Sequence, residues 1–268
     1  MQDKKIIGEQ NKLAILHYLY RFGYLTSRQI SKLVFRKKAC SLTLAQRKIA
    51  DLLQDKLIIR RRVKTGNAVV LLSSKGARLL NAEFNLHAKS GVKMKLGNPI
   101  HRCASNWHLI HELSKGHNIY TEHEIQCGRA PVSICYGKIP DGIVIIEQGI
   151  IWLEVENSWK NKAEIQKIVQ FSADTLSNPN SMEQMWEDNY LVKLRILAIT
   201  PYSANAMVRS YAKDFKDGCI NHIALNDVQL MYAPMTTGLI YPEENEVQKF
   251  DLLEDLVLPY LAGKDVKF

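Results

Sequence analysis

The stretch PDGIVIIEQGIIWLEVENSW, residues 140–159, decides the fold of the second half of the chain. It holds two apolar segments, residues 143–146 and 150–153, whose β-branched side chains are typical of strands. Between them, Gln148 and Gly149 are typical of a tight turn. The stretch therefore predicts a β-hairpin.

Three carboxylates are set into this hairpin. A two-residue loop at the predicted turn places Asp141 opposite Glu156 and Ile143 opposite Glu154. Because side chains alternate along a strand, all three acids then share one face. Like charges so placed repel each other and lower stability, so we expect them to serve a function.

Composition describes an ordinary globular protein. The 268 residues are 46% hydrophobic and 24% charged, enough for one large or two modest domains. We expect neither a membrane segment nor a signal peptide, because no apolar run approaches about 18 residues. The five scattered cysteines form no CxxC pair, which argues against a disulfide framework or structural zinc and is typical of the reducing cytoplasm.

Charge is distributed unevenly. Residues 1–100 hold 21 Lys and Arg but 5 Asp and Glu, a net charge of +16. Residues 101–268 hold 15 and 22, a net charge of −7. This division predicts a basic domain at 1–90 that contacts nucleic acid, joined through a basic linker at 84–99 to an acidic domain at 91–268.

The basic half reads as a winged helix-turn-helix. Gly23 ends a first helix, Thr26 or Ser27 caps a second, and Ser41 or Thr43 begins a third. A strand, a turn, a second strand and a further helix follow over residues 58–80. In that fold the third helix enters the major groove and the wing lies along phosphates.

Polar and basic residues on these elements are the candidate DNA contacts; each one could equally be a solvated surface group. On the third helix they are Gln46, Arg47 and Lys48. On the wing they are Arg60, Arg61, Arg62 and Lys64. Binding through them should depend steeply on salt, because each neutralised phosphate releases counterions.

The acidic half predicts a mixed α and β class (α/β or α+β), with elements in the order αβββαβα around a mixed sheet. With Pro140-Asp141 on one strand and Glu154-Val155-Glu156 on the next, it resembles the PD-(D/E)XK restriction-endonuclease-like sandwich. Glu156 stands where that superfamily usually has Lys. The winged helix, the ExE pattern and the sequence KIVQF beginning at Lys167 together resemble MobC-type plasmid relaxases and replication–relaxation proteins.

This resemblance implies a metal-dependent DNA endonuclease that nicks double-stranded DNA at a plasmid transfer origin, with a relaxosome accessory protein and a coupling protein as partners. It implies Mg²⁺ or Mn²⁺ held by Asp141, Glu154, Glu156 and the carbonyl of Val155. Oxygen-rich sites suit these hard cations. Lys167 would hold the attacking water or neutralise charge in the transition state.

Histidines and tyrosines leave alternatives open. His101, at a position where the relaxation family tends to have a histidine, lies with His108 and His111 on one predicted helix. They are candidates for acid–base roles near the metal or simply partly buried helix residues. A tyrosine nucleophile is the alternative to metal-activated water.

Three function classes therefore follow from the sequence. The first is a plasmid-nicking relaxase, a hydrolase used in mobilization and conjugation. The second is a non-catalytic DNA-binding regulator of plasmid replication. The third is another PD-(D/E)XK endonuclease, acting in transposition or defence.

Overall fold

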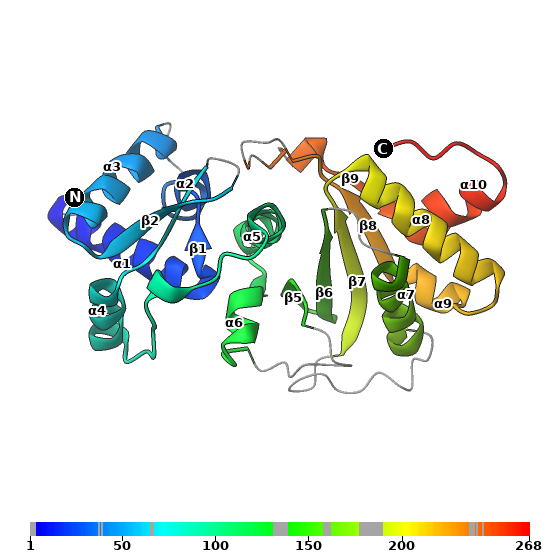
Figure 1. Cartoon of the computed structure of the whole chain (residues 1–268), viewed down its shortest axis with the longest axis horizontal. Coiled ribbons are helices and arrows are strands. Elements are labelled where there is room, and N and C mark those ends of the chain that lie inside the picture. Colours follow the sequence, from blue (N-terminus) through cyan, green and yellow to red (C-terminus); the bar gives the residue numbers. More distant parts are fainter. Residues whose placement is uncertain are drawn as a thin grey trace. The chain divides into compact units, whose positions relative to one another are not determined.

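The computed structural model describes residues 4–36, 38, 40–64, 67–130, 139–157, 162–176, 190–235, 239, 241–242 and 244–268. The chain divides into two compact units, Met1–Ser114 and Lys115–Phe268 (Figure 1). Both combine helices with a sheet, and the sheet of the second unit is mixed, which confirms the predicted mixed α and β class.

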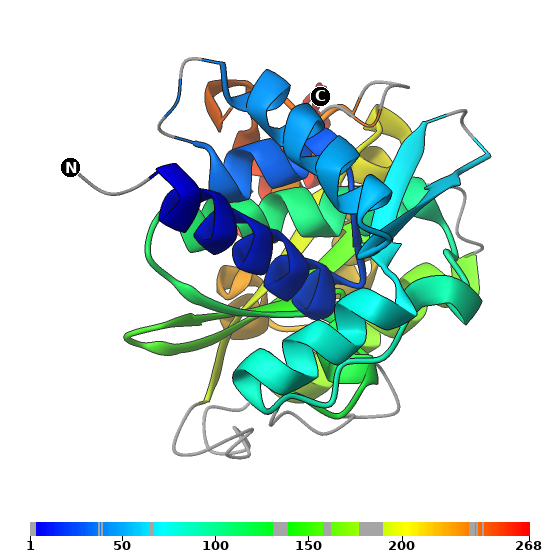
Figure 2. The same ribbon diagram turned by 90° about the vertical axis from the view of Figure 1, so that its left-hand side faces the viewer.

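The first unit is built from five helices and a small antiparallel sheet within its described residues (Figure 2). The strand order is β1-β3-β2. The elements are α1 (Lys4–Phe22), β1 (Tyr24–Leu25), α2 (Ser27–Val34), α3 (Ser41–Gln54), β2 (Ile58–Arg62), β3 (Ala68–Leu72), α4 (Ser74–Phe84), the 3-10 turn η1 (Gly91–Lys93) and α5 (Pro99–Ser114).

Local sequence signals set the ends of the first helices. α1 ends before Gly23, whose φ of +77° lies in the left-handed region that favours glycine. Thr26 caps α2 and forms a capping box with Gln29, as predicted for its N-cap. α3 differs from the prediction, because its N-cap is Cys40, whose side chain makes no capping hydrogen bond.

The helix α5, which the sequence assigned to the second domain, groups with the first unit. Two buried hydrogen bonds tie it there. Gln29 Nε2 donates to the Cys103 carbonyl at 3.1 Å, and Asn106 Nδ2 donates to the Tyr24 carbonyl at 3.1 Å. Both hydrogen bonds join residues far apart in the sequence, so no local sequence pattern predicts them.

The second unit contains a six-stranded sheet with the order β4-β5-β6-β7-β8-β9. The pairs β6–β7 and β7–β8 are parallel and the other pairs are antiparallel. The elements are β4 (Asn118–Thr121), α6 (Glu122–Gln126), β5 (Gly142–Ile146), β6 (Gly149–Glu156), α7 (Lys162–Leu176), β7 (Leu191–Ala198), α8 (Pro201–Lys216), α9 (His222–Asn226), β8 (Val228–Tyr232), η3 (Glu244–Glu246), β9 (Gln248–Asp251), the π-helical turn η4 (Leu252–Val257) and α10 (Leu258–Leu261).

The predicted hairpin forms, but its register is shifted by two residues. Ile146 pairs with Gly149, so Glu147 and Gln148 make the turn and the prediction of a turn at Gln148 and Gly149 is wrong. Gly149 instead lies in β6 with φ +140°, where an added Cβ would stand 2.5 Å from the Tyr190 carbonyl oxygen. A shift of two keeps the alternation, so Glu154 and Glu156 remain on the predicted face.

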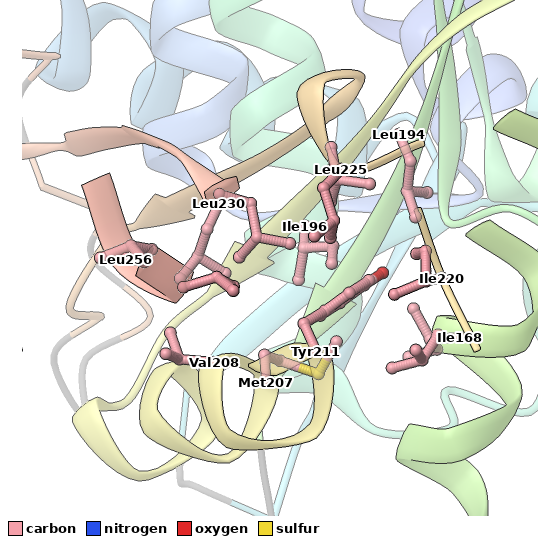
Figure 3. Packing of buried hydrophobic residues seen from close by; sticks show 14 of the residues in the cluster. Ile168, Leu194, Ile196, Met207, Val208, Tyr211, Ile220, Leu225, Leu230 and Leu256 are labelled. Atoms are coloured by element: carbon pink, nitrogen blue, oxygen red, sulfur yellow. The ribbon is translucent and has the colours of Figure 1, made fainter. Parts of the chain in front are cut away.

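A hydrophobic core lies on this same face of the sheet (Figure 3). Trp152 of β6 and Leu194 and Ile196 of β7 are fully buried in it. α7 and α8 cover them, and the rings of Trp152 and Phe171 lie 4.7 Å apart between centroids. The two glutamates of β6 are therefore set into a strand whose every position is buried.

Within the described residues, none of the helices has both the length and the apolar character needed to cross a bilayer.

Candidate functional site

Asp141 is held at the start of the hairpin by two hydrogen bonds to β6. Its backbone N–H donates to the Leu153 carbonyl at 3.0 Å. Its Oδ2 accepts from the Val155 N–H at 2.7 Å. This carboxylate therefore lies beside the segment that carries Glu154 and Glu156, with a fixed orientation.

Glu154 is oriented by its own strand. Its side chain is buried, at 3% exposure, and Oε1 accepts from the indole Nε1 of Trp152 at 2.6 Å. The indole is fixed in turn by packing against Phe171 of α7. Charge-assisted hydrogen bonds of this kind are short and strong, so the pair places one carboxylate oxygen with little freedom.

Glu156 ends β6 and is also buried, at 2% exposure. Its carbonyl oxygen accepts from the Ile199 N–H at 3.0 Å and from Ser203 Oγ at 3.0 Å. Ser203 belongs to the capping box that begins α8 at Thr200. The end of β6 is thus tied to the start of the helix that covers it.

A buried tyrosine lies near the glutamates. The Tyr211 hydroxyl is 2.6 Å from Ser172 Oγ. Burial raises the pKa of Tyr211 above its ordinary range, and the hydrogen bond with Ser172 acts in the opposite direction. The charges of Glu154, Glu156 and Asp214 raise this pKa further. The effect indicates that three carboxylates act on one hydroxyl, which stays protonated at neutral pH.

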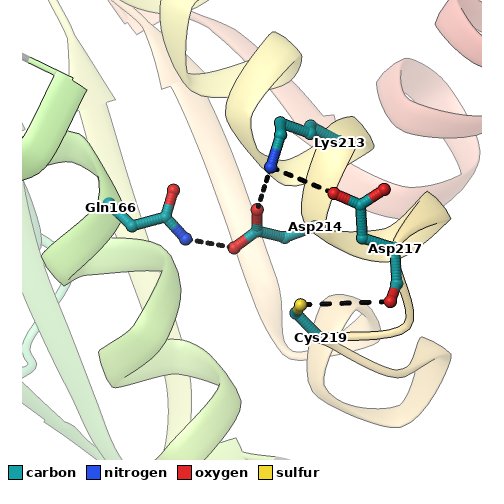
Figure 4. A network of polar contacts seen from close by, with 5 residues as sticks. All are labelled: Gln166, Lys213, Asp214, Asp217 and Cys219. Atoms are coloured by element: carbon teal, nitrogen blue, oxygen red, sulfur yellow. Dashed lines mark hydrogen bonds and ion pairs between the residues drawn. The ribbon is translucent and has the colours of Figure 1, made fainter.

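Asp214 is a buried acid that the sequence did not single out, and it links α7 to α8 (Figure 4). Gln166 Nε2 donates to its Oδ2, and Lys213 Nζ lies 3.9 Å from its Oδ1. Lys213 also pairs with Asp217 at 3.0 Å, and that contact raises the pKa of Lys213. Gln166 is half-buried and uncharged, so a search of the sequence for charged residues overlooks it.

Lys167 is not brought together with the acids. Its side chain is 68% exposed, and its Nζ pairs with Glu164 Oε1 at 2.9 Å. Ile165 and Ile168 mark the buried stripe of α7, and Lys167 lies about 200° around the helix from Ile165. We expected its ammonium to reach the carboxylate face, and with α7 oriented in this way it does not.

The carboxylates suit a divalent cation by their chemistry. In the part of the chain that the structure describes, no three His, Cys, Asp or Glu side chains are grouped so that they could hold a metal ion. Mg²⁺, however, is commonly held by one or two carboxylates, with waters and substrate phosphates completing its shell. Asp141 and Glu154, each with one oxygen fixed by a hydrogen bond, fit that smaller requirement.

The other predicted members of the site lie as follows. Val155 is fully buried and pairs with Leu197 of β7. His101 is half-buried near the start of α5, in the first unit. His108, on the same helix, is buried, and its Nε2 lies 3.9 Å from Glu112 Oε1, which is the arrangement of a buried helix pair rather than of an exposed acid–base group.

The predicted DNA contacts of the first unit are mostly exposed. Gln46 and Arg47 are exposed on α3 and Lys48 is half-buried. Arg60 and Arg62 are exposed on one face of β2.

The remaining two wing candidates behave differently. Arg61 points to the opposite face of β2 and donates to the Met94 carbonyl, so it serves the fold. Lys64 is exposed, and the next two residues of the turn, 65 and 66, lie outside the described residues.

Comparison of the chain with protein-family models, with curated proteins and with solved structures found no match.

Proposed function

We propose that the chain binds double-stranded DNA through its first unit and nicks it with a divalent cation held by Asp141 and Glu154. The pair of oriented carboxylates at the β5–β6 hairpin carries this proposal. Their order on two adjacent strands, followed by α7 and a parallel β7, supports the resemblance to PD-(D/E)XK nucleases. By the same resemblance, the substrate is a plasmid transfer origin and the enzyme is a cytoplasmic relaxase.

DNA binding is supported by the first unit taken alone. Three helices precede an antiparallel hairpin, β2–β3, and a short β1 completes the sheet, as in a winged helix. The exposed side chains of α3 and of the outer face of β2 include Arg47, Arg60 and Arg62. The net charge of +16 in residues 1–100 supplies the attraction to phosphates.

The residues around the acids have separable tasks. The Val155 N–H and the Trp152 indole each fix one oxygen of a carboxylate, so the orientation of Asp141 and of Glu154 is set before any ligand binds. Mg²⁺ or Mn²⁺ bound by these two side chains would polarise the scissile phosphate and lower the pKa of a coordinated water. Glu156, buried two residues further along β6, adds a further carboxyl group, and oxygen-rich sites suit hard cations.

A second function is favoured by the position of Lys167. Because this lysine pairs with Glu164 on the outer side of α7, the cation that the family motif supplies is displaced. A DNA-binding regulator of plasmid replication needs the first unit but no such cation. The two proposals share DNA binding and differ in strand cleavage.

A plasmid-relaxation assay separates them. Supercoiled plasmid is incubated with the protein in Mg²⁺, in Mn²⁺ or in EDTA, and open-circular product is measured. We expect metal-dependent nicking that Asp141→Asn and Glu154→Gln abolish, while gel-shift affinity for DNA stays close to wild type. The exposed acids Asp265 and Glu254 give matched control variants, Asp265→Asn and Glu254→Gln.

Binding without nicking in either metal would favour the regulator. Equal nicking of plasmids with and without a transfer origin would favour a less specific endonuclease.

A further inference from the structure

The segment between α4 and α5, residues 85–98, is here named the strap. The sequence predicts a basic linker over residues 84–99, and in the structure the strap is fastened to the first unit. Asn81 of α4 makes two hydrogen bonds with the backbone of Ala88, at 2.6 Å and 3.2 Å. Further along, the Tyr24 hydroxyl donates to the Leu96 carbonyl at 3.2 Å.

The middle of the strap packs closely against the sheet. A Cβ added to Gly91 would stand 2.8 Å from Cβ of Leu71, so this glycine allows a close approach. Arg61 reaches from β2 to donate to the Met94 carbonyl. These contacts fix the strap on the face of the sheet that carries Leu71 and Arg61.

The strap adds cations to the face opposite to Arg60 and Arg62. Strand alternation places those two arginines on the other side of β2 from Arg61. On the strap, Lys89, Lys93 and Lys95 are exposed.

The sequence around these lysines is free of acidic residues. It holds no acid between Glu83 and Glu112. The β2–β3 hairpin therefore carries Arg60 and Arg62 on one face, and a fastened segment with three exposed lysines packs on the other.

We propose that the strap is a second phosphate-binding surface for double-stranded DNA, through Lys89, Lys93 and Lys95. This inference rests on the proposed DNA binding by the first unit. Lysine contacts to phosphates carry no sequence information, so the strap should raise affinity equally for every sequence while α3 discriminates between them. Because the backbone of the strap is already ordered, it loses less conformational entropy when it binds DNA, and binding costs less free energy.

The test measures how the DNA affinity of the full chain depends on salt. The triple variant Lys89/Lys93/Lys95→Ala is compared with wild type by fluorescence anisotropy over a series of salt concentrations. The affinity falls as salt rises, and each lost phosphate contact reduces the magnitude of the negative slope of log K against log salt by about 0.9. We expect a decrease of about 2 to 3, of the same size for specific and random duplexes.

Two matched variants interpret the result. The first removes three exposed lysines of the second unit, Lys216, Lys264 and Lys267, and changes the net charge by the same amount. The second, Lys89/Lys93/Lys95→Arg, keeps the charge and should restore the slope. Circular dichroism melts of each variant verify that the fold is retained.

The outcomes separate the two proposals. If the strap variant reduces the magnitude of the salt slope no more than the second-unit control does, the strap does not contact phosphates. DNA binding itself is judged by Arg47→Ala: if the wild type binds and Arg47→Ala weakens it while the strap variant does not, only the strap inference fails. If the wild type does not bind duplex DNA, the proposed function fails with it.

Discussion

Replacing Asp141 tests whether its carboxylate has a structural task as well as a chemical one. Asp141→Ala removes the acceptor, 2.7 Å away, of the Val155 N–H. Val155 is fully buried, so water cannot easily replace the lost partner. Leaving a buried donor unsatisfied costs about 1–3 kcal/mol. We expect a loss of stability of this size even in EDTA, where no metal contributes.

Hydrogen exchange at the Val155 amide measures this loss directly. Since about 1.4 kcal/mol corresponds to a tenfold change, the amide should exchange roughly 5- to 140-fold faster in Asp141→Ala than in the wild type. Urea unfolding followed by fluorescence should report a lower free energy of unfolding. Exchange of Val155 at the wild-type rate in this variant would refute the hydrogen bond and the reasoning built on it.

The conservative variant Asp141→Asn separates structure from chemistry. The asparagine side chain retains a carbonyl oxygen as acceptor, so this variant should keep the Val155 amide protected. It lacks the negative charge that a divalent cation requires, so metal-dependent nicking should be lost. Normal nicking by the folded variant would show that the Asp141 carboxylate is not a metal ligand.

Further predictions follow from the described geometry. Trp152→Phe, which deletes the indole donor to a carboxylate, should weaken Mn²⁺ binding in a calorimetric titration more than Lys167→Ala, whose ammonium lies on the far side of its helix. Gly8→Ala, with open space around it in α1, should stabilise by roughly 1 kcal/mol. Gly76→Ala should destabilise in the same urea assay, because the new Cβ would lie 2.1 Å from a carbonyl oxygen. Burial raises the pKa of Cys103 from 9.0 to about 12, so this thiol should resist iodoacetamide at neutral pH, as peptide mass spectrometry would show. Its contribution to stability is complete below pH 9.0 and is lost as pH rises toward 12, because only the unfolded chain then releases the proton readily.

The elements of the first unit could be predicted because their signals are local. Gly23 ends α1 through its left-handed backbone, and Thr26 with Gln29 begins α2 through a capping box. The attachment of α5 could not be predicted in this way. It depends on buried hydrogen bonds from Gln29 to Cys103 and from Asn106 to Tyr24, which join residues far apart in the chain.

The hairpin was predicted in kind but not in register. Two contacts with Tyr190, a residue outside the hairpin, decide the register. Gly149 must approach the Tyr190 carbonyl closely, and Ile150 donates to that same carbonyl at 2.8 Å. Gly149, which the sequence assigned to the turn, is therefore required in β6. The acids still lie on the predicted face of the sheet, because the register differs from the prediction by an even number of residues.

The phase of α7 decides which of its side chains meets the acids, and sequence spacing alone does not fix that phase. A motif counts residues from the glutamates, whereas a helix turns about 100° per residue, so the packing of its apolar stripe sets where each position points. Ile165, Ile168 and Val169 pack onto the core with Trp152, which turns Lys167 outward.

The described side chains of that stripe offer apolar groups and the Ser172 hydroxyl, but no cation. Charge compensation at the acids must then come from a ligand or from another element. Metal binding by the carboxylates is therefore a more direct test of this site than the presence of a motif lysine.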